Sequence, residues 1–355
     1  MLRALASPRA RLAWRLSGFV TNPHEQCGLS MMPKYDASIY VAGHAGLIGS
    51  AVVRRLERDG YRPPITRRRS ELDLEDAGQV SEFFEKVRPE YVILAAGRVG
   101  GIMENQTFPA DFMDENMAIQ LNVLRTARKA GVRRLILFGS SCMYPGECSQ
   151  PMAEDTLLSG KPEPTSLPYA ISKLAGTYLC LAYNKQDHET RFVPVIPNSA
   201  YGPYDNFDPK SAHVLSAIMA RFHQAKVNGD ESVVLWGSGL PRREFIHADD
   251  IAAACVHLLR QDDLAAELPI NIGAGQDVSI KELAELIAEV VGYKGRVEWD
   301  RTKPDGAPRK LLDSARIQSL GWKPQVGLAE GLSETYRWYV GHVETQAASM
   351  QEARR

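Results

Sequence analysis

The chain has 355 residues, is 44% hydrophobic and 24% charged, and carries a formal net charge of -1. This balance is typical of a globular protein with a sizeable core, and a nearly neutral chain has no global field that would recruit nucleic acid or an acidic membrane. The five cysteines are scattered without a Cys-x-x-Cys pair, which argues against a disulfide framework or a metal site and favours a reducing compartment, the cytoplasm. No apolar run reaches the roughly 18 residues of a membrane span.

Residues 1–35 differ in composition from the rest of the chain. They carry four arginines before the first acidic residue, Glu25. An Arg-rich, acid-poor leader is compatible with an organelle transit peptide. Because Met31 and Met32 stand directly before the first expected strand, we favour a disordered extension or a start codon placed too early, and we exclude this segment from the fold.

Short apolar segments then alternate with amphipathic ones. Strands are expected at 38–42, 65–66, 91–96, 135–138 and 192–196, and a helix at 50–59. Pro63 and Pro64 weaken the strand at 65–66. Strands separated by helices predict a parallel sheet with right-handed crossovers, so the expected fold class is α/β, a Rossmann doubly wound sheet.

The pattern becomes mixed after about residue 201. A short strand is expected at 233–235, and Ser279 with Glu282 forms a capping box that opens a helix to about Val291. We predict a smaller mixed α/β substrate-binding lobe. It takes 201–245 and 275–345, whereas 36–200 forms the Rossmann domain and 246–274 returns to it.

Three glycines, Gly43, Gly46 and Gly49, stand between the first strand and the first helix. In dinucleotide-binding folds the first glycine makes a tight turn, the second admits the pyrophosphate and the third lets the helix pack on the strand. The helix N-terminus at Leu47 and Ile48 then offers free N–H groups to phosphate. This placement predicts a dinucleotide site.

Arginines stand where a site for NAD needs an acid. Such an acid lies about 20 residues after the glycines and binds the ribose hydroxyls, but the chain has Thr66-Arg67-Arg68-Arg69 there. Guanidiniums bind the 2′-phosphate of NADP, which a carboxylate would repel. A solvated basic turn is the alternative for this run. Its place at a strand end favours NADP(H), with Arg67 and Arg69 as ligands.

Tyr169 and Lys173 are four residues apart and share one face of an expected helix. The Lys173 ammonium is expected to lower the pKa of the Tyr169 phenol toward that of a usable acid. Ser140 follows the strand at 135–138, at the sheet edge where ligands bind in this architecture. Tyr-x-x-x-Lys alone is also compatible with two surface residues. Together with Ser140 it resembles the hydride-transfer set of the extended short-chain dehydrogenases.

Longer segments resemble the GDP-L-fucose synthase family, the GDP-4-keto-6-deoxy-D-mannose 3,5-epimerase-4-reductases. The most specific are Ser-Ser-Cys-Met-Tyr-Pro at 140–145 and Lys-Pro-Asp-Gly-Ala-Pro-Arg-Lys at 303–310. Other matches lie at 41–44, 99–102, 150–154, 163–165, 168–173, 201–207, 236–239 and 243–247.

This resemblance implies two reactions at one site. Cys142 and His213 match the acid–base pair that inverts C3 and C5 of a keto sugar, whose C4 ketone acidifies the neighbouring protons. NADPH then reduces C4 while Tyr169 protonates the oxygen and Ser140 hydrogen-bonds it. On their own, Cys142 and His213 would be a buried thiol and a structural histidine. The resemblance implies further cofactor ligands, which are Asp73, Leu74, Lys173, Pro197, Ser199 and His213. It also implies GDP-sugar ligands, which are Arg221, Trp236, Arg243, Asp305 and Lys310.

Two departures from the family pattern bear on specificity. Ala45 stands where relatives can have arginine, and the arginines at 67–69 would compensate. Pro-Asn-Ser-Ala-Tyr at 197–201 replaces the usual Pro-Thr-Asn-Leu-Tyr, which leaves a related GDP-deoxyhexose as an alternative product.

Three other functions are less favoured. A 4,6-dehydratase needs a carboxylate where Cys142 and Met143 stand, and the arginines argue against a 4-epimerase that retains NAD. A non-catalytic NADP-binding scaffold would not need Ser140, Tyr169 and Lys173. By analogy with the fold class we expect a homodimer, with no nucleic-acid, membrane or metal partner.

Overall fold

The computed structural model describes residues 33–352 apart from residues 190, 209–210, 262–263, 265–266 and 304, and for 344–352 it describes the backbone alone. Residues 1–32 of the expected extension at 1–35 therefore lie outside the described residues. Among the described residues, no helix combines the length and the apolar character needed to cross a membrane.

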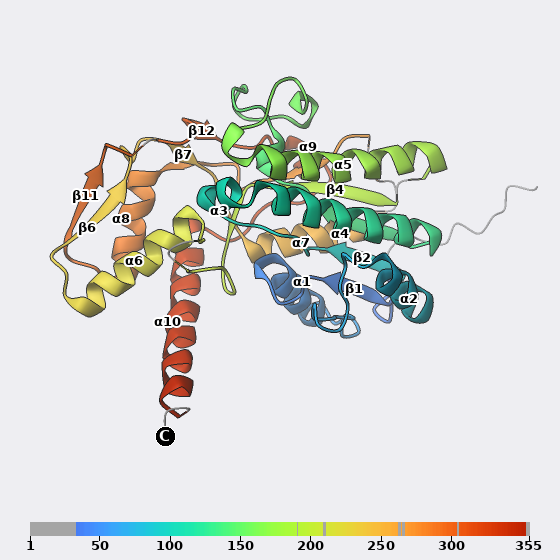
Figure 1. The fold of residues 1–355 in the computed structure, drawn as a ribbon, viewed down its shortest axis with the longest axis horizontal. Helices are drawn as coiled ribbons and strands as arrows, with labels where there is room; N and C mark the ends of the chain where they lie inside the picture. The colour runs from blue at the N-terminus through green and yellow to red at the C-terminus, as the bar shows by residue number, and fades with distance from the viewer. Residues whose placement is uncertain are drawn as a thin grey trace, which may run out of the picture. The chain divides into compact units, whose positions relative to one another are not determined.

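A parallel five-stranded sheet in the order β1-β2-β3-β4-β9 forms the centre of the larger lobe (Figure 1). Every residue of these strands is buried, which explains their nearly continuous apolar character. The strands are β1 Ile39–Ala42, β2 Tyr91–Leu94, β3 Arg134–Phe138, β4 Phe192–Pro197 and β9 Ile270–Ile272.

The expected strand at 65–66 is reduced to one isolated parallel bridge between Ile65 and Tyr40. The Ile65 N–H donates to the Ile39 carbonyl at 2.8 Å, and the Val41 N–H donates to the Ile65 carbonyl at 2.9 Å. Two prolines precede Ile65 and lack the N–H groups that a longer ladder would use.

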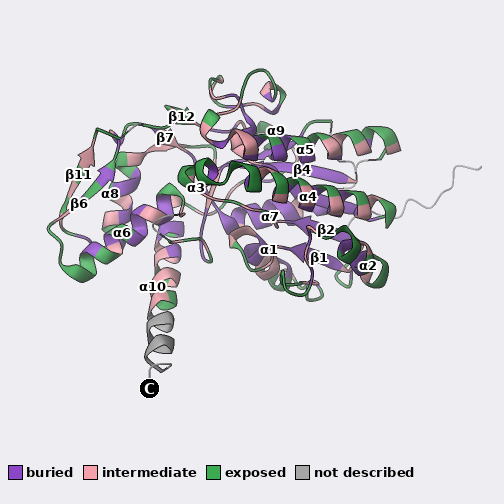
Figure 2. Ribbon diagram, in the orientation of Figure 1, coloured by how far each residue is buried: buried purple, intermediate pink, exposed green. Residues whose placement is uncertain are grey.

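Helices cover both faces of the sheet (Figures 1 and 2). Ile39 and Val41 face one core cluster together with α1 and α7, whereas Tyr40 and Ala42 face the other together with α2, α4 and α5. This arrangement confirms the predicted doubly wound α/β fold. The helices of this lobe are α1 Leu47–Arg58, α2 Ala77–Val87, α3 Ile102–Thr107, α4 Pro109–Lys129, α5 Leu167–Asp187, α7 Ala248–Leu259 and α9 Ala315–Ser319.

A smaller mixed lobe has its own apolar core, built from α6, α8, the start of α10 and the parallel pair β6 and β11. The predicted capping box is present, because the Ser279 hydroxyl accepts from the Glu282 N–H at 3.1 Å and the Glu282 carboxylate accepts from the Ser279 N–H at 2.7 Å. The helices are α6 Val214–Asn228, α8 Ile280–Val291 and α10 Leu328–Glu352. The strands outside the main sheet are β5 Ser199–Tyr201, β6 Ser232–Trp236, β7 Arg242–Arg243, β8 Phe245–His247, β10 Val278–Ser279, β11 Arg296–Asp300 and β12 Arg309–Lys310. Of these, β5 and β8 pair with each other and contribute to the cores of both lobes.

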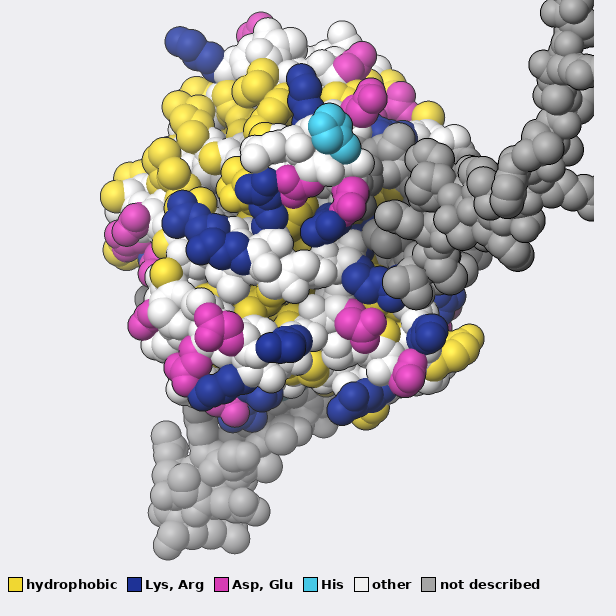
Figure 3. Space-filling view, turned by 90° about the vertical axis from the view of Figure 1, so that its right-hand side faces the viewer, with side chains coloured by type: hydrophobic (Ala, Val, Ile, Leu, Met, Phe, Trp, Pro, Cys, Tyr) yellow, Lys and Arg dark blue, Asp and Glu magenta, His cyan; other side chains and the backbone are white. Residues whose placement is uncertain are grey.

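Charged side chains of both signs are interspersed over the face shown in Figure 3. Ion pairs join neighbouring elements of the larger lobe; Arg128 of α4, for example, pairs with Asp187 at the end of α5. Hydrophobic side chains gather in the upper left of the same view, at the height of α4 and α5 in Figure 1.

Candidate active site

The glycine loop between β1 and α1 is shaped for close backbone approach. Gly43 has a φ of +79°, and a Cβ there would lie 2.6 Å from the Ala96 nitrogen. A Cβ on Gly49 would overlap the Gly43 carbonyl. Gly46 is the N-cap of α1, and neither a capping side chain nor an acid in the first turn occupies the helix N-terminus. These N–H groups therefore remain available to an anion.

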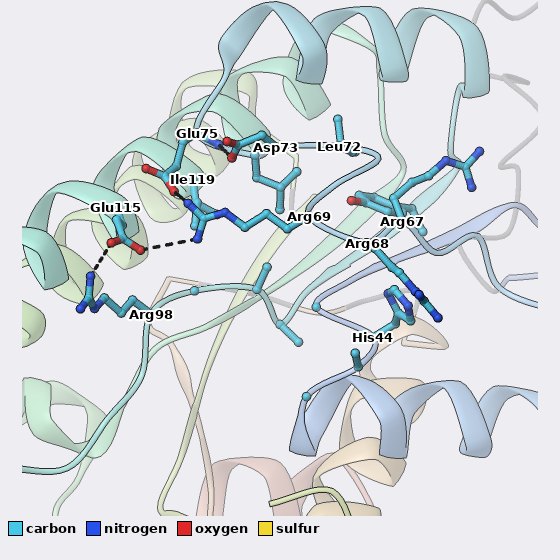
Figure 4. Close-up of a pocket in the computed structure, with 18 residues that line it drawn as sticks. His44, Arg67, Arg68, Arg69, Leu72, Asp73, Glu75, Arg98, Glu115 and Ile119 are labelled. Carbon is cyan, nitrogen blue, oxygen red and sulfur yellow. Dashed lines mark hydrogen bonds and ion pairs between the residues drawn. The ribbon is translucent and has the colours of Figure 1, made fainter. Parts of the chain in front are cut away.

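A cavity of about 610 Å³ lies between this loop and the segment that follows Ile65. Figure 4 shows its walls, which come from the glycine loop, the arginine run, the segment after β2 and α4. The lining residues include Gly43, Gly46, Arg67, Arg68, Arg69, Asp73, Leu74, Arg98 and Glu115. The expected residues Gly43, Gly46, Arg67, Arg69, Asp73 and Leu74 thus border one cavity.

Tyr169 and Lys173 lie on α5 beside Ser140, the residue that precedes a short 3-10 helix, η1 (Ser141–Met143), after β3. The Tyr169 phenol is buried and hydrogen-bonds Ser140, and the ring of Phe112 packs edge-on against it at 6.1 Å between centroids. The Lys173 Nζ lies 5.8 Å from the Tyr169 ring centroid. The structure brings the three predicted residues together.

The expected lowering of the Tyr169 pKa is not found. Burial raises the pKa of Tyr169, a negative charge on Cys142 would raise it further, and only the hydrogen bond from Ser140 opposes these effects. Burial also lowers the pKa of Lys173 to about 8. Desolvation therefore dominates both groups and favours a neutral phenol and a readily deprotonated amine.

Cys142 lies in η1, half-buried, with its backbone N–H donating to the Ser140 hydroxyl at 3.3 Å. His213 is exposed and forms the N-cap of α6. The segment just before it approaches α3, since the Gly101 N–H donates to the Ser211 carbonyl at 3.3 Å. The Cys142 thiol is therefore next to Tyr169. His213 follows a segment that contacts the N-terminus of α3.

Asp205 is a half-buried carboxylate that the sequence analysis did not single out. It accepts from the hydroxyl of Ser216 in the first turn of α6, and from the Asn206 N–H at 2.8 Å. Burial raises the pKa of Asp205, whereas the Ser216 hydrogen bond and the nearby His213 oppose that rise. Asp205 lies in the matched segment 201–207. One acidic residue in a loop forms no sequence pattern from which its partial burial could be predicted.

The predicted sugar-nucleotide ligands lie on the smaller lobe. Arg243 of β7 pairs in register with Lys310 of β12, and its Nη1 donates to the Ala307 carbonyl at 2.6 Å. Asp305 accepts from the Ser238 N–H at 2.8 Å and from its hydroxyl at 2.6 Å. Arg243 is close enough for its charge to help lower the pKa of Asp305, after the larger effect of the two Ser238 hydrogen bonds.

The other predicted ligands lie on neighbouring elements. Trp236 ends β6, has 60% of its surface exposed and carries the Lys303 Nζ 5.6 Å from its ring centroid. Arg221 on α6 donates to the Val234 carbonyl at 2.8 Å. Pro197 ends β4 of the main sheet, and Ser199 begins β5, which pairs with β8 in a separate sheet.

The doubly wound sheet with a grouped serine, tyrosine and lysine defines the extended Rossmann dehydrogenases, and comparison with known proteins agrees. The model of the NAD dependent epimerase/dehydratase family matches residues 39–273. GDP-L-fucose synthase 1 of Arabidopsis thaliana is 51% identical over 315 residues, which cover 89% of this chain and 97% of the relative. The GDP-L-fucose synthase of Escherichia coli K12 is 47% identical over 312 residues, 85% of this chain and 96% of that protein.

A solved GDP-L-fucose synthetase from Naegleria fowleri, bound to NADP, is similar with a TM-score of 0.80 at 28% identity over 88% of this chain and 97% of that one. The chain therefore belongs to the NAD dependent epimerase/dehydratase family and, within it, to the GDP-L-fucose synthases.

Proposed function

We propose that this protein is an NADPH-dependent epimerase-reductase that converts GDP-4-keto-6-deoxy-D-mannose to GDP-L-fucose. The observation that carries the proposal is the grouping of Ser140, Tyr169 and Lys173 with Cys142 beside the phenol. It occurs in a chain that is about half identical to GDP-L-fucose synthase 1 of Arabidopsis over nearly its full length. We assign residues 36–200 with 246–274 to the Rossmann domain and 201–245 with 275–345 to the substrate lobe, from which α9 packs back onto the core of the Rossmann domain.

The glycine loop and the cavity fit a dinucleotide. A side chain at Gly43 or Gly49 would close the approach, the uncapped start of α1 suits the pyrophosphate, and the loop at 66–69 supplies guanidiniums for the 2′-phosphate. Asp73 and Leu74, which line the cavity, would hold the adenosine end of the cofactor. Lys173, Pro197, Ser199 and His213 would hold the nicotinamide end. The bound cofactor supplies the hydride for C4 of the sugar.

Cys142 and His213 carry out the inversions. The Cys142 thiolate removes the proton from a carbon beside the ketone, and the protonated His213 returns a proton to the opposite face. The thiol then releases its proton to water and the imidazole takes one up, so that the same pair of transfers can occur at C3 and at C5. A thiol and an imidazole are side-chain types that general acid–base catalysis uses.

Tyr169 then donates its proton to the C4 oxygen. A pKa raised by burial keeps that proton on the phenol until the oxygen becomes basic. Ser140 hydrogen-bonds the same oxygen as its charge grows. Lys173, in its protonated form, stabilises the phenolate that remains.

The smaller lobe holds the GDP moiety. Arg243 and Lys310 lie side by side in a register that suits a diphosphate. Asp305 is fixed by Ser238, and the exposed ring of Trp236 offers a surface for stacking. Arg221 lies on α6 behind β6.

Incubation with GDP-4-keto-6-deoxy-D-mannose in deuterated water separates the two stages. Without NADPH, the wild type is expected to exchange the protons at C3 and C5; with NADPH it should form GDP-L-fucose. Tyr169→Phe should retain exchange but reduce C4 roughly 10²- to 10⁴-fold more slowly. Cys142→Ala should lose exchange, whereas Cys148→Ala, the matched half-buried control, should not.

Normal exchange by Cys142→Ala would refute the role of the thiol. Identification of the product distinguishes GDP-L-fucose from a related GDP-deoxyhexose.

The protein is further proposed to be a cytoplasmic homodimer. Met117 and Leu121 of α4 and Ile171 and Tyr178 of α5 leave an apolar stripe exposed at helical spacing on two packed helices. The four described cysteines are all free, which suits a reducing compartment.

A further inference from the structure

Arg243 and Lys310, the two cations proposed to bind the diphosphate, lie on a very small sheet of the substrate lobe. Its strands β10, β7 and β12 have two residues each, and β7 and β12 lie side by side (Figure 1). Arg242 pairs in register with Arg309, and Arg243 with Lys310. Because successive side chains of a strand point to opposite faces, Arg243 and Lys310 share one face, and Arg242 and Arg309 share the other.

Asp277, the residue directly before β10, binds both arginines of the second face. One carboxylate oxygen accepts from the Arg242 Nε at 2.7 Å, and the other accepts from the Arg309 Nε. The Asp277 carbonyl also accepts from the Arg242 Nη2 at 2.8 Å. Only 5% of the Asp277 side chain is exposed, whereas the two guanidinium side chains are 42% and 43% exposed. One buried carboxylate therefore joins all three strands.

The Asp277 carboxylate is held in its ionised form. Burial acts to raise the pKa of Asp277, but the hydrogen bonds from Arg309 and Arg242 outweigh it, so that the pKa is lowered. Charge-assisted bonds of this kind are about twice as strong as bonds between neutral groups. Glu282 also pairs with Arg242, at 3.4 Å and with half of its side chain exposed, and it is the weaker of the two partners.

The alignment of β7 and β12 determines where the two diphosphate cations point. Strands of two residues form too few ladder bonds to hold their register alone. A slip of β12 by one residue would turn Lys310 to the face opposite Arg243. Arg243 is itself fixed, because its Nη1 donates to the Arg242 carbonyl at 2.8 Å and to the Ala307 carbonyl at 2.6 Å. The register therefore decides whether Arg243 and Lys310 can bind one diphosphate together.

We propose that Asp277 is a positioning residue for sugar-nucleotide binding, which aligns Arg243 and Lys310 for one diphosphate by binding Arg242 and Arg309 on the opposite face. The inference rests on the proposed function and adds to it a residue that acts through the sheet. A diphosphate far from the reacting ketone is bound equally in the ground state and the transition state, so its contacts lower KM without raising kcat. Loss of the alignment should therefore raise KM alone.

The test uses Asp277→Asn, which keeps the size of the side chain and one acceptor oxygen but removes the charge. Calorimetric titration at fixed ionic strength gives the Kd for GDP and for NADPH. Asp277→Asn should weaken GDP roughly 5- to 30-fold and leave the Kd for NADPH unchanged. In the deuterium-exchange assay with GDP-4-keto-6-deoxy-D-mannose, its KM should rise by a similar factor at an unchanged kcat.

Two further variants separate positioning from general stability. Asp59 also bridges two guanidiniums, those of Arg55 at 2.9 Å and Arg260 at 3.3 Å, but in the Rossmann domain. Asp59→Asn is the matched control and should bind GDP within roughly twofold of the wild type. Arg309→Met, at an exposed position, should weaken GDP as Asp277→Asn does, and the double variant should lose no more than the weaker single variant, because both act through one contact.

Four outcomes would overturn the assignment. Normal GDP affinity in Asp277→Asn would show that the register holds without the carboxylate. An equal loss of NADPH affinity, or a fall in kcat, would show a general structural role instead. Additive losses in the double variant would mean that Arg309 acts independently of Asp277. A wild type without GDP affinity, or an Arg243→Gln variant that binds GDP normally, would refute the proposed GDP site itself, which sets that failure apart from the other three.

Discussion

At the scale of single residues, the fold lowers the pKa of Lys173 into a range where its effect on stability can be measured. Its ordinary pKa of 10.5 falls to about 8 because the amine is buried. Below pH 8 both folded and unfolded chains hold this proton, and the cost of burying the ammonium is fully present. Between pH 8 and 10.5 the unfolded chain holds more protons, so stability should rise with pH in this window.

Urea unfolding of the cofactor-free protein tests this. From pH 7.5 to 9.5 the free energy of unfolding of the wild type should gain about 2 kcal/mol relative to Lys173→Met, which cannot titrate. Parallel curves for the two proteins would mean that the amine stays hydrated.

The surroundings of single side chains are also what the sequence predicted least well. Tyr-x-x-x-Lys correctly placed Tyr169 and Lys173 on one helix beside Ser140. It gave the wrong direction for the Tyr169 pKa, because the burial comes in part from Phe112 of α4, a helix far away in the sequence. The run at 67–69 predicts a phosphate-binding site, but it does not reveal that Arg69 pairs with Glu75 and with Glu115 of α4.

At the scale of elements, the sequence predicted a helix or strand correctly where the residues that determine it all lie in one segment. The helix α8 has Ser279 as its N-cap, as predicted, because both bonds of the capping box join residues three apart. The strands of the main sheet were found because burial on both faces requires apolar runs. Ile65 forms only a bridge, because the neighbouring prolines limit the ladder.

Ser279→Ala should destabilise the protein by about 1 kcal/mol through loss of the cap. Ser81→Ala, inside α2 and away from any cap, is the matched control and should be neutral or slightly stabilising. Denaturant midpoints at constant m-value measure the difference. Equal midpoints for the two variants would show that α8 does not depend on its cap.

At the scale of the whole molecule, Glu244 joins the edge of the main sheet to the segments around it. The side chain is fully buried and accepts from the Asn198 amide at 2.7 Å, the Gly275 N–H at 2.7 Å and the Leu312 N–H at 3.0 Å. No local pattern identifies this residue, because its donors come from three distant segments.

Glu244→Ala would leave two buried donors, the Asn198 amide and the Leu312 N–H, without the carboxylate that they bind. At about 1–3 kcal/mol for each unsatisfied buried group, the loss should reach at least about 2 kcal/mol. Glu244→Gln keeps one acceptor oxygen and should cost less. Thermal unfolding ranks the variants, and an alanine variant as stable as the wild type would mean that water replaces the carboxylate.

The exposed apolar stripe on α4 and α5 is the surface through which we propose that two copies of the chain form a dimer. A charge at its centre would have to lose its hydration in a two-fold helical interface, which costs several kcal/mol. Leu121→Glu should therefore shift the protein from dimer to monomer in sedimentation velocity at micromolar concentration. Val227→Glu, at an exposed apolar position on α6 of the other lobe, should leave the dimer intact. Because Leu121 is 40% exposed in the single chain, the folded monomer should keep its unfolding midpoint; a monomeric wild type, or a dimeric Leu121→Glu, would show that this stripe is not the interface.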